Sequence, residues 1–462
     1  MDNRTAKNTK KSPVNFKLSP LNPCVAGIDI GAASIFTCAG FCDGRQEVRE
    51  HLTFTEDLKQ MAKWLKECGI KSVAMESTGV YWIPVYDILS QEGFDVVLVN
   101  AYYLKTVPGK KTDVKDCQWI QQLHAYGLLH GSFRPDNEGV ELRGYVRQRS
   151  RLVQLAAQQV SLIHKSLTQM NLQLNHVISD ITGSTGMDII RAIVLGERDP
   201  KVLAGYRNPR CKKSKEEIAK ALDGNYREEH LLAIKQALES YDLFHRQVDE
   251  CEKALENFLE RWEDRNTLSH STGGAGEDVI KKAAMKTECN KSPYGFEAEE
   301  SLKRILGVNL LDVPGFDVNG VIKIIGEVGT DMTKWPTFKH FSSWLGLCPG
   351  NKVSGGKVLS SRTKPSANRA AGALRLAAFT LYRSKSALGA YYRKMRARLG
   401  APKAITATAH KLARILYAML REKKSFVEIG QEAYEQAYKE RQVASLKRKA
   451  KELGFALSEV AC

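Results

Sequence analysis

Short apolar runs between residues 24 and 127 predict a succession of strands and helices. Residues 24–54 contain three candidate strands, VAGIDIG, SIFTCAGFC and QEVREHLTF, which are joined by Gly-Ala-Ala and Asp-Gly-Arg turns. Further along, the runs KSVAMES and FDVVLVN read as buried strands. They alternate with segments of helical period, EDLKQMAKWLKECG, VYWIPVYDILSQEG and DVKDCQWIQQLHAYG. A three-strand meander followed by such alternation is typical of an RNase H-like mixed sheet with helices on both faces.

Two longer segments carry apolar residues at alternating spacings of three and four, as the seam of a coiled coil does. They span residues 139–175 and 228–263, and they predict two long helices that pair as a hairpin or dimerise. Ordinary core-facing stripes would produce the same pattern. The seam positions are Val153, Ala156, Val160, Ile163, Leu167, Met170 and Leu174 in the first, and Leu231, Ile234, Leu238, Tyr241, Val248, Leu255 and Trp262 in the second.

The rest of the chain reads as mainly helical, apart from residues 263–300, which are poor in apolar residues and predict a linker or mobile loop. The segment SLKRILGVNLLDVPGFDVNGVIKIIGEVG resembles a helix-hairpin-helix, whose PGF turn would direct backbone N–H groups at a phosphate. A loop or hairpin around Gly355 and Gly356 follows, then three helices and a basic, exposed helical tail.

We therefore predict the fold class α/β plus α. It combines an RNase H/RuvC-like mixed-sheet domain, coiled-coil helices, and a mainly helical C-terminal domain with a helix-hairpin-helix-like segment. The predicted parts, in chain order, are a disordered basic arm, the mixed-sheet domain, the coiled-coil helices with an insertion at 176–227, a linker or loop, the C-terminal domain and a basic tail. Their bounds are 1–22, 23–135, 136–265, 266–300, 301–425 and 426–462.

Charge narrows the class of partner. The 462-residue chain has a formal net charge of +17, which favours nucleic acid as partner over an anionic membrane surface. We find no apolar stretch of membrane-spanning length and no apolar core of a signal peptide near the N-terminus. The ten cysteines show no CxxC pairs, and we expect reduced thiols in a cytoplasmic, nucleoid-associated protein of a bacterium or archaeon.

Four carboxylates fall where a metal-binding nuclease fold would place acids. Asp29 lies on the first predicted strand, Glu76 ends the fourth, and Asp113 and Asp116 share one face of the first turn of a helix. Three or four carboxylates together hold two Mg²⁺ ions about 4 Å apart, the arrangement used in phosphoryl transfer. Taken singly, each acid is more often structural: Asp29 is then a strand-end acid and Asp113 a helix cap. Only together, in this order on these elements, do the four acids favour a metal site.

A second constellation is KVSGGKVLSSRTKPSANRA, in which Ser354 precedes two glycines and several cations. The glycines permit close approach of a ligand, and a serine hydroxyl there would attack a DNA phosphorus to form a phosphoserine. A solvated Gly-Gly hairpin is the plainer interpretation. The candidate phosphate-binding cations of this segment are Lys357, Arg362, Lys364 and Arg369.

Further cations stand near the acids and on the first long helix. Lys110 and Lys111 directly precede the Asp113 segment, and an arginine-rich stretch follows at 141–151. Both are candidates to follow a nucleic-acid backbone, and a solvated charged face is the alternative for the arginines, Arg143, Arg147, Arg149 and Arg151.

The motifs just described resemble a known family. GIDIG, MESTGVYW, VNAYYLK and KKTDVKD are similar to the N-terminal domain of the DEDD insertion-sequence transposases, the IS-one-ten (IS110) family, also called bridge recombinases. LLDVPGFD, FSSWLGLCPG, SGGK and the GALRLAAF helix resemble the second, transposase domain of that family. The resemblance covers most of residues 24–420, with both motif sets in the family's order.

This resemblance implies a RuvC-like domain with a DEDD metal site, a coiled-coil linker, and a C-terminal domain that supplies a catalytic serine. Carried over, Asp29, Glu76, Asp113 and Asp116 would hold Mg²⁺ and Ser354 would be the nucleophile, in one composite site. It also implies dimers that assemble into tetramers on target and donor DNA, and a bound non-coding guide RNA. The chain departs from the family in having Cys117 where alanine is usual, and in its length.

The leading hypothesis is therefore a site-specific DNA recombinase that excises and inserts a mobile element. One alternative is a RuvC-like junction nuclease that uses the acids and metal-activated water but not Ser354. Another is an actin-like or sugar-kinase-like ATPase, whose fold also begins with a DIG strand but needs a second Gly-rich phosphate loop that we do not find. A third is a non-catalytic nucleic-acid-binding scaffold.

Overall fold

The computed structural model describes residues 19–77, 79–104, 112–267, 294–363, 366, 368–456 and 458. The chain divides into two compact units, Met1–Arg134 and Pro135–Cys462. Most of the predicted basic arm and of the predicted linker at 266–300 lies outside the described residues. The same holds for three of the candidate cations, Lys110, Lys111 and Lys364.

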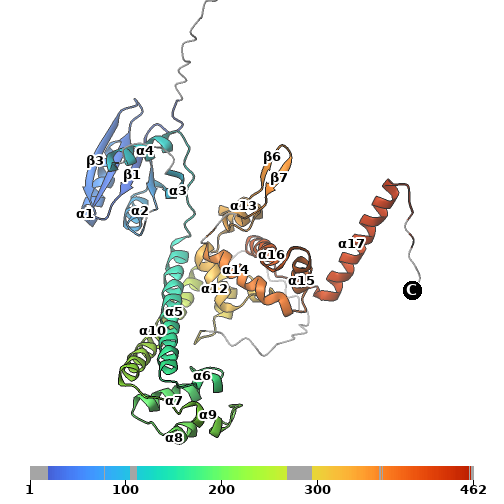
Figure 1. The fold of residues 1–462 in the computed structure, drawn as a ribbon. Helices are drawn as coiled ribbons and strands as arrows, with labels where there is room; N and C mark the ends of the chain where they lie inside the picture. Colours follow the sequence, from blue (N-terminus) through green and yellow to red (C-terminus); the bar gives the residue numbers. More distant parts are fainter. Residues whose placement is uncertain are drawn as a thin grey trace, which may run out of the picture. The chain divides into compact units, whose positions relative to one another are not determined.

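The first unit contains a five-stranded mixed sheet in the order β3-β2-β1-β4-β5 (Figure 1). The three N-terminal strands pair antiparallel as a meander, and β4 and β5 add in parallel beside β1. This arrangement confirms the predicted fold class. The strands are β1 (Val25–Ile30), β2 (Ser34–Gly40), β3 (Gln46–Leu52), β4 (Ser72–Glu76) and β5 (Asp95–Val99).

Both faces of the sheet are covered, because neighbouring residues of a strand point to opposite faces. On β4, Val73 and Met75 pack into the core under α1 and α2, while Ala74 between them packs with Ile120 of α4 on the other face. The helices of this unit are α1 (Thr55–Glu67), α2 (Trp82–Gln91), α3 (Ala101–Leu104) and α4 (Asp113–Ala125).

In the second unit, the two predicted long helices form an antiparallel pair, α5 (Asn137–Gln169) and α10 (Glu228–Thr267). The prediction that the first runs to residue 175 is wrong, because Asn171 takes a left-handed φ of 56° and turns the chain. The predicted insertion folds onto one end of the pair (Figure 1) and shares its buried core. Its helices are α6 (Leu174–Val177), α7 (Ser184–Val194), α8 (Pro200–Gly205) and α9 (Lys215–Ala221).

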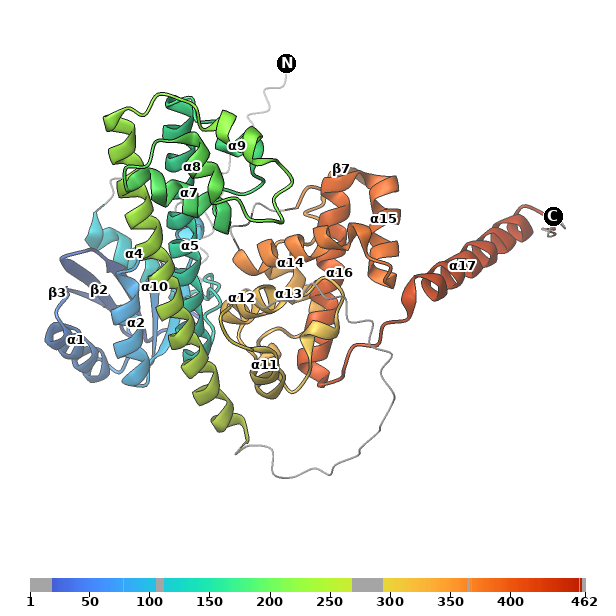
Figure 2. The same cartoon turned by 90° about the horizontal axis from the view of Figure 1, so that it is seen from below.

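The C-terminal part is mainly helical, as predicted, and its helix α14 packs against both α12 and α16 (Figure 2). A two-stranded hairpin extends from it, β6 (Lys352–Ser354) and β7 (Lys357–Ser360). The helices are α11 (Glu299–Leu306), η1 (Leu310–Asp312), α12 (Val318–Val328), η2 (Met332–Lys334), α13 (Phe338–Trp344), α14 (Arg369–Thr380), η3 (Leu381–Arg383), α15 (Ala387–Leu399), α16 (Ala401–Glu422) and α17 (Gly430–Glu452). No residue of α17 is buried, in keeping with the predicted exposed tail.

One expectation about the cysteines is wrong. Cys24 and Cys42 form a disulfide that ties the start of β1 to the end of the β2 segment, so the expectation of reduced thiols throughout is wrong. The antiparallel meander brings the two cysteines together, which their spacing alone did not reveal. None of the helices in the described part of the chain combines the length and apolar character that crossing a membrane requires.

Candidate functional site

Asp29 and Glu76 lie side by side in the sheet. Strands β1 and β4 pair in parallel with Ile28 opposite Met75, so the next residues, Asp29 and Glu76, stand at the carboxyl ends of two neighbouring strands. Both acids are half-buried. The buried apolar residues that precede each acid fix the two backbones in the sheet.

The first turn of α4 comes to the same region. Gly27 permits this approach, because a Cβ atom there would lie 2.5 Å from the Cys117 carbonyl oxygen and 2.7 Å from Gln121 Cα. Burial raises the pKa of the Cys117 thiol to about 12, and the nearby Cys38 and Asp29 add to the rise. Asp29 is thus within electrostatic reach of the residue that directly follows Asp116.

The two aspartates of α4 are positioned by the helix start. Thr112 is the N-cap, with its hydroxyl accepting a hydrogen bond from the Lys115 N–H, so Asp113 is not the capping residue. Asp113 is exposed and Asp116 half-buried. Both carboxylates belong to the first turn, where the helix dipole favours negative charge.

The four acids offer the hard oxygen ligands that Mg²⁺ prefers, and in donor chemistry they suit that ion. Strand register and helix packing bring Asp29, Glu76 and the first turn of α4 to the carboxyl ends of strands β1 and β4. Over the described residues, however, no group of three or more His, Cys, Asp or Glu side chains has a geometry ready to hold a metal ion.

Ser354 lies in the hairpin of the second unit, at the end of β6 and opposite Lys357. The turn consists of Gly355 and Gly356, with φ of +54° and +76°. Two successive positive φ values are typical of a tight two-residue hairpin turn. Ser354 is exposed, and the glycines leave open space where side chains would be. The plainer interpretation of this motif, a Gly-Gly hairpin, thus describes its backbone.

Apolar side chains of the hairpin are also exposed. Val353, Val358 and Leu359 expose 58%, 61% and 70% of their surface. The base of the hairpin is closed by the Gly350 N–H, which donates to the Arg362 carbonyl, and by a bridge between Pro349 and Thr363. Lys357 and Arg362 are exposed on the same hairpin.

Three of the four candidate arginines of α5 form contacts inside the protein. Arg147 makes a forked ion pair with Glu327 of α12, at 2.8 and 2.9 Å. Arg143 donates to the Gly326 and Glu327 carbonyls. Arg149 pairs at 2.7 Å with Glu252 of α10 and lies over the ring of Tyr294.

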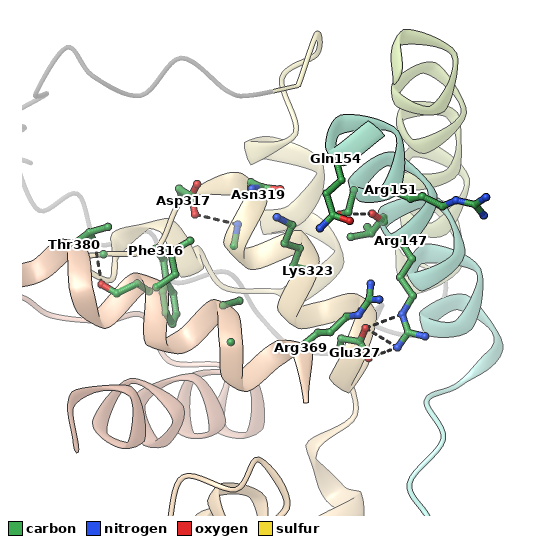
Figure 3. Close-up of a pocket in the computed structure, with 18 residues that line it drawn as sticks. Arg147, Arg151, Gln154, Phe316, Asp317, Asn319, Lys323, Glu327, Arg369 and Thr380 are labelled. Carbon is green, nitrogen blue, oxygen red and sulfur yellow. Dashed lines mark hydrogen bonds and ion pairs between the residues drawn. The ribbon is translucent and has the colours of Figure 1, made fainter. Parts of the chain in front are cut away.

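The fourth arginine, Arg151, is exposed. With Arg369 it lines a cleft of about 850 Å³ between α5, α12 and α14 (Figure 3). Sequence reasoning did not select Lys323, which also lines this cleft, because a single lysine within an apolar helix carries no signal of its own.

Comparison with known proteins finds a family match for the region of each of the two motif sets. Residues 26–172 match the family model DEDD_Tnp_IS110, described as a transposase, and residues 307–393 match one described as "Transposase IS116/IS110/IS902 family". The first match contains all four acids and the second contains Ser354. Together they cover about half of the chain.

A curated relative matches part of the chain. The "Insertion element IS110 uncharacterized 43.6 kDa protein" of Streptomyces coelicolor is 27% identical over 179 residues, which are 37% of this chain and 43% of that protein. The matched region thus spans less than half the length of the relative.

Proposed function

The chain belongs to the IS110 family of transposases, and we propose that it cuts and rejoins DNA at the ends of a mobile element. The observation that carries this proposal is the alignment of Asp29, Glu76 and the start of α4 at one edge of the sheet. A hydroxyl on an exposed hairpin, Ser354, supports the nucleophile assignment.

We assign Asp29, Glu76, Asp113 and Asp116 as the ligands of a divalent cation, with Mg²⁺ as the expected ion. When bound, such an ion polarises a phosphoryl oxygen and neutralises charge that develops during strand cleavage. The chain contributes rigidity: β1 and β4 fix two acids, and the packing of α4 on Gly27 fixes the helix that carries the other two.

Ser354 would attack the scissile phosphorus. The serine oxygen forms a new P–O bond, and the P–O bond that joins this phosphorus to one neighbouring deoxyribose breaks. Overall, the hydroxyl proton is transferred to the released deoxyribose oxygen. The product is a serine–DNA phosphodiester, which conserves the bond energy needed for rejoining. Lys357 and Arg362, which are exposed on the same hairpin, would offset charge on the phosphoryl oxygens.

Covalent attachment tests the serine. Purified protein is incubated with labelled donor DNA and Mg²⁺, denatured, and resolved by electrophoresis. We expect a protein–DNA adduct with wild type and with the control Ser360→Ala, which alters another serine of the hairpin, and none with Ser354→Ala. An adduct formed by Ser354→Ala would rule out this nucleophile.

Substitution of an acid tests the metal ligands. Asp29→Asn should lower strand cleavage by about two orders of magnitude or more, because metal stabilisation of the transition state contributes several kcal/mol. Asp95→Asn is the matched control, since Asp95 begins β5 at the opposite end of the sheet. Equal activity of the two variants would contradict the assignment.

The junction-nuclease reading remains the alternative, since it needs only the acids. It predicts cleavage by Ser354→Ala at the wild-type rate and no adduct with any variant. We further propose, from the family resemblance, target and donor DNA as substrates, a homodimer that assembles to a tetramer, and a guide RNA. Sequencing of RNA that copurifies with the full chain tests the last point, and absence of any enriched RNA would refute it.

A further inference from the structure

The cleft between α5, α12 and α14 has no role in the proposed chemistry. Its volume is about 850 Å³, and it is formed wholly within the second unit. We propose that this cleft binds the sugar–phosphate backbone of a single-stranded nucleic-acid segment, with Lys323 and Arg369 as the cations that contact phosphate.

The charges of the cleft leave these two cations available. Both acids of its lining already have partners: Asp317 caps α12 by accepting from the Gly320 N–H, and Glu327 holds Arg147. Over the described residues, neither Lys323 nor Arg369 has an ion-pair partner. Figure 3 shows both side chains extending from their helices into the space between α5, α12 and α14.

The position of Lys323 favours an anionic ligand. Burial lowers the pKa of its ammonium group below the ordinary value, and the nearby Arg149 lowers it further, while Asp317 acts in the opposite direction. A half-buried cation that has lost hydration gains most from a phosphate oxygen, since charge-assisted hydrogen bonds replace the lost water. Neutral donors stand beside it, the amides of Gln154 and Asn319.

The rest of the cleft lining indicates that the ligand is a nucleic-acid strand rather than a free anion. On α14, Gly372, Ala373 and Leu376 line the cleft, and Leu376 exposes 63% of its surface. Such an apolar wall can receive the face of an unstacked base or sugar. The volume is that of a small-ligand pocket, enough for about one or two nucleotides but too small for a duplex.

Salt-dependent binding measures the interactions with phosphate. A short fluorescein-labelled single-stranded DNA is titrated with the full chain in EDTA at several salt concentrations, and anisotropy gives the binding constant. A plot of log K against log salt has a negative slope, and removal of one cation from a phosphate makes it less steep by about 0.7. Lys323→Gln together with Arg369→Gln should therefore make it less steep by about 1.4. The matched control is Arg383→Gln with Lys385→Gln, two exposed cations outside the cleft, with an equal change in net charge.

A space-filling variant guards against misfolding of the charge variant. Gly372 has open space where a Cβ would lie, so Gly372→Met begins its side chain without a clash, its flexible remainder extends into the cleft, and the loss of glycine should itself favour the helix. We expect it to weaken oligonucleotide binding at unchanged or higher melting temperature. If both cleft variants show the same salt slope and the same affinity as the control pair, the proposal is overturned.

Competition by free nucleotides distinguishes binding of a nucleic-acid strand from binding of a free phosphate compound. ATP or pyrophosphate should compete weakly with the oligonucleotide. Tight binding of ATP that depends on Lys323 and Arg369, with oligonucleotide binding unchanged in their variants, would make this a nucleotide site and refute the nucleic-acid assignment. The inference deepens the proposed function by placing a strand contact, but binding in EDTA is independent of cleavage, so each can fail without the other.

Discussion

Gly27→Ala is the substitution that most directly tests how the acids are brought together. The new methyl group would lie 2.5 Å from the Cys117 carbonyl oxygen and 2.7 Å from Gln121 Cα, and both atoms belong to the backbone of α4. An ordinary contact begins near 3.4 Å. No side-chain rotation relieves the clash, so α4 must withdraw from β1 by about 1 Å, the difference between these distances.

Two effects of different size should follow. Overpacking of a close helix–strand contact costs about 1–3 kcal/mol of unfolding free energy, and we expect the upper end because backbone atoms are involved. Withdrawal of α4 also moves Asp113 and Asp116 relative to Asp29. A misplacement of about 1 Å in a catalytic arrangement costs about 100-fold in rate. Cleavage should therefore fall further than stability alone would explain.

Urea unfolding and Mg²⁺-dependent DNA cleavage, measured on the same preparations, separate the two effects. Gly131→Ala is the control, because its Cβ would meet only a Val97 methyl at 3.7 Å. Gly40→Ala is intermediate: its Cβ would meet the amide end of the Gln121 side chain, which can rotate away at the loss of its bonds to Val25 and Gln46. The reasoning is refuted if Gly27→Ala matches Gly131→Ala in both stability and cleavage.

Three other predictions concern stability. Glu327→Gln removes the forked pair with Arg147 and should lower the unfolding free energy by about 1–2 kcal/mol, measured in urea, whereas Glu422→Gln, at an exposed pair, should change it little. Burial lowers the pKa of His124 below 6.5, so as pH falls the unfolded chain takes up the proton before the folded chain does. The contribution of His124 to stability is therefore fully present above its unfolded-state pKa and is lost as pH falls toward its folded-state pKa. His124→Gln should flatten this pH dependence between neutral and mildly acidic pH. Reduction of the Cys24–Cys42 disulfide, which spans 18 residues, should cost about 3 kcal/mol in wild type and nothing in Cys42→Ser, as shown by melting with and without reductant.

The fold of the first unit could be predicted because each element carries its own period. Strands β1 and β4 each contain an uninterrupted apolar run, residues 25–28 and 73–75, as expected of strands buried on both faces. Local pattern failed where tertiary packing decides. Leu174 continues the apolar seam predicted for the first long helix and is buried, yet the chain has already turned at Asn171 to begin the insertion. Val153, another seam position, is 43% exposed, since α10 covers only one side of α5.

The candidate site could be predicted in part for a related reason. The acids end strands or begin a helix, so their placement follows from local elements and from the right-handed connections between parallel strands. Partners distant in sequence could not be predicted. Glu327 lies 180 residues from Arg147, and Glu252 lies 103 residues from Arg149, with no motif linking them. The Cys24–Cys42 pair depends on the same kind of information.

The arginines of α5 show why a net charge of +17 does not by itself locate a nucleic-acid surface. The last turn of any α-helix leaves carbonyl groups without intrahelical partners, and its negative dipole end attracts cations. Arg143 satisfies two such carbonyls at the end of α12, of Gly326 and Glu327. A guanidinium is suited to this work because its planar fork donates several bonds at once. An arginine that holds helix-end carbonyls has fewer donors left for phosphate. The search for a binding surface is therefore better begun from cations that have no ion pair among the described residues, as Lys323 and Arg369 have none in the cleft between α5, α12 and α14.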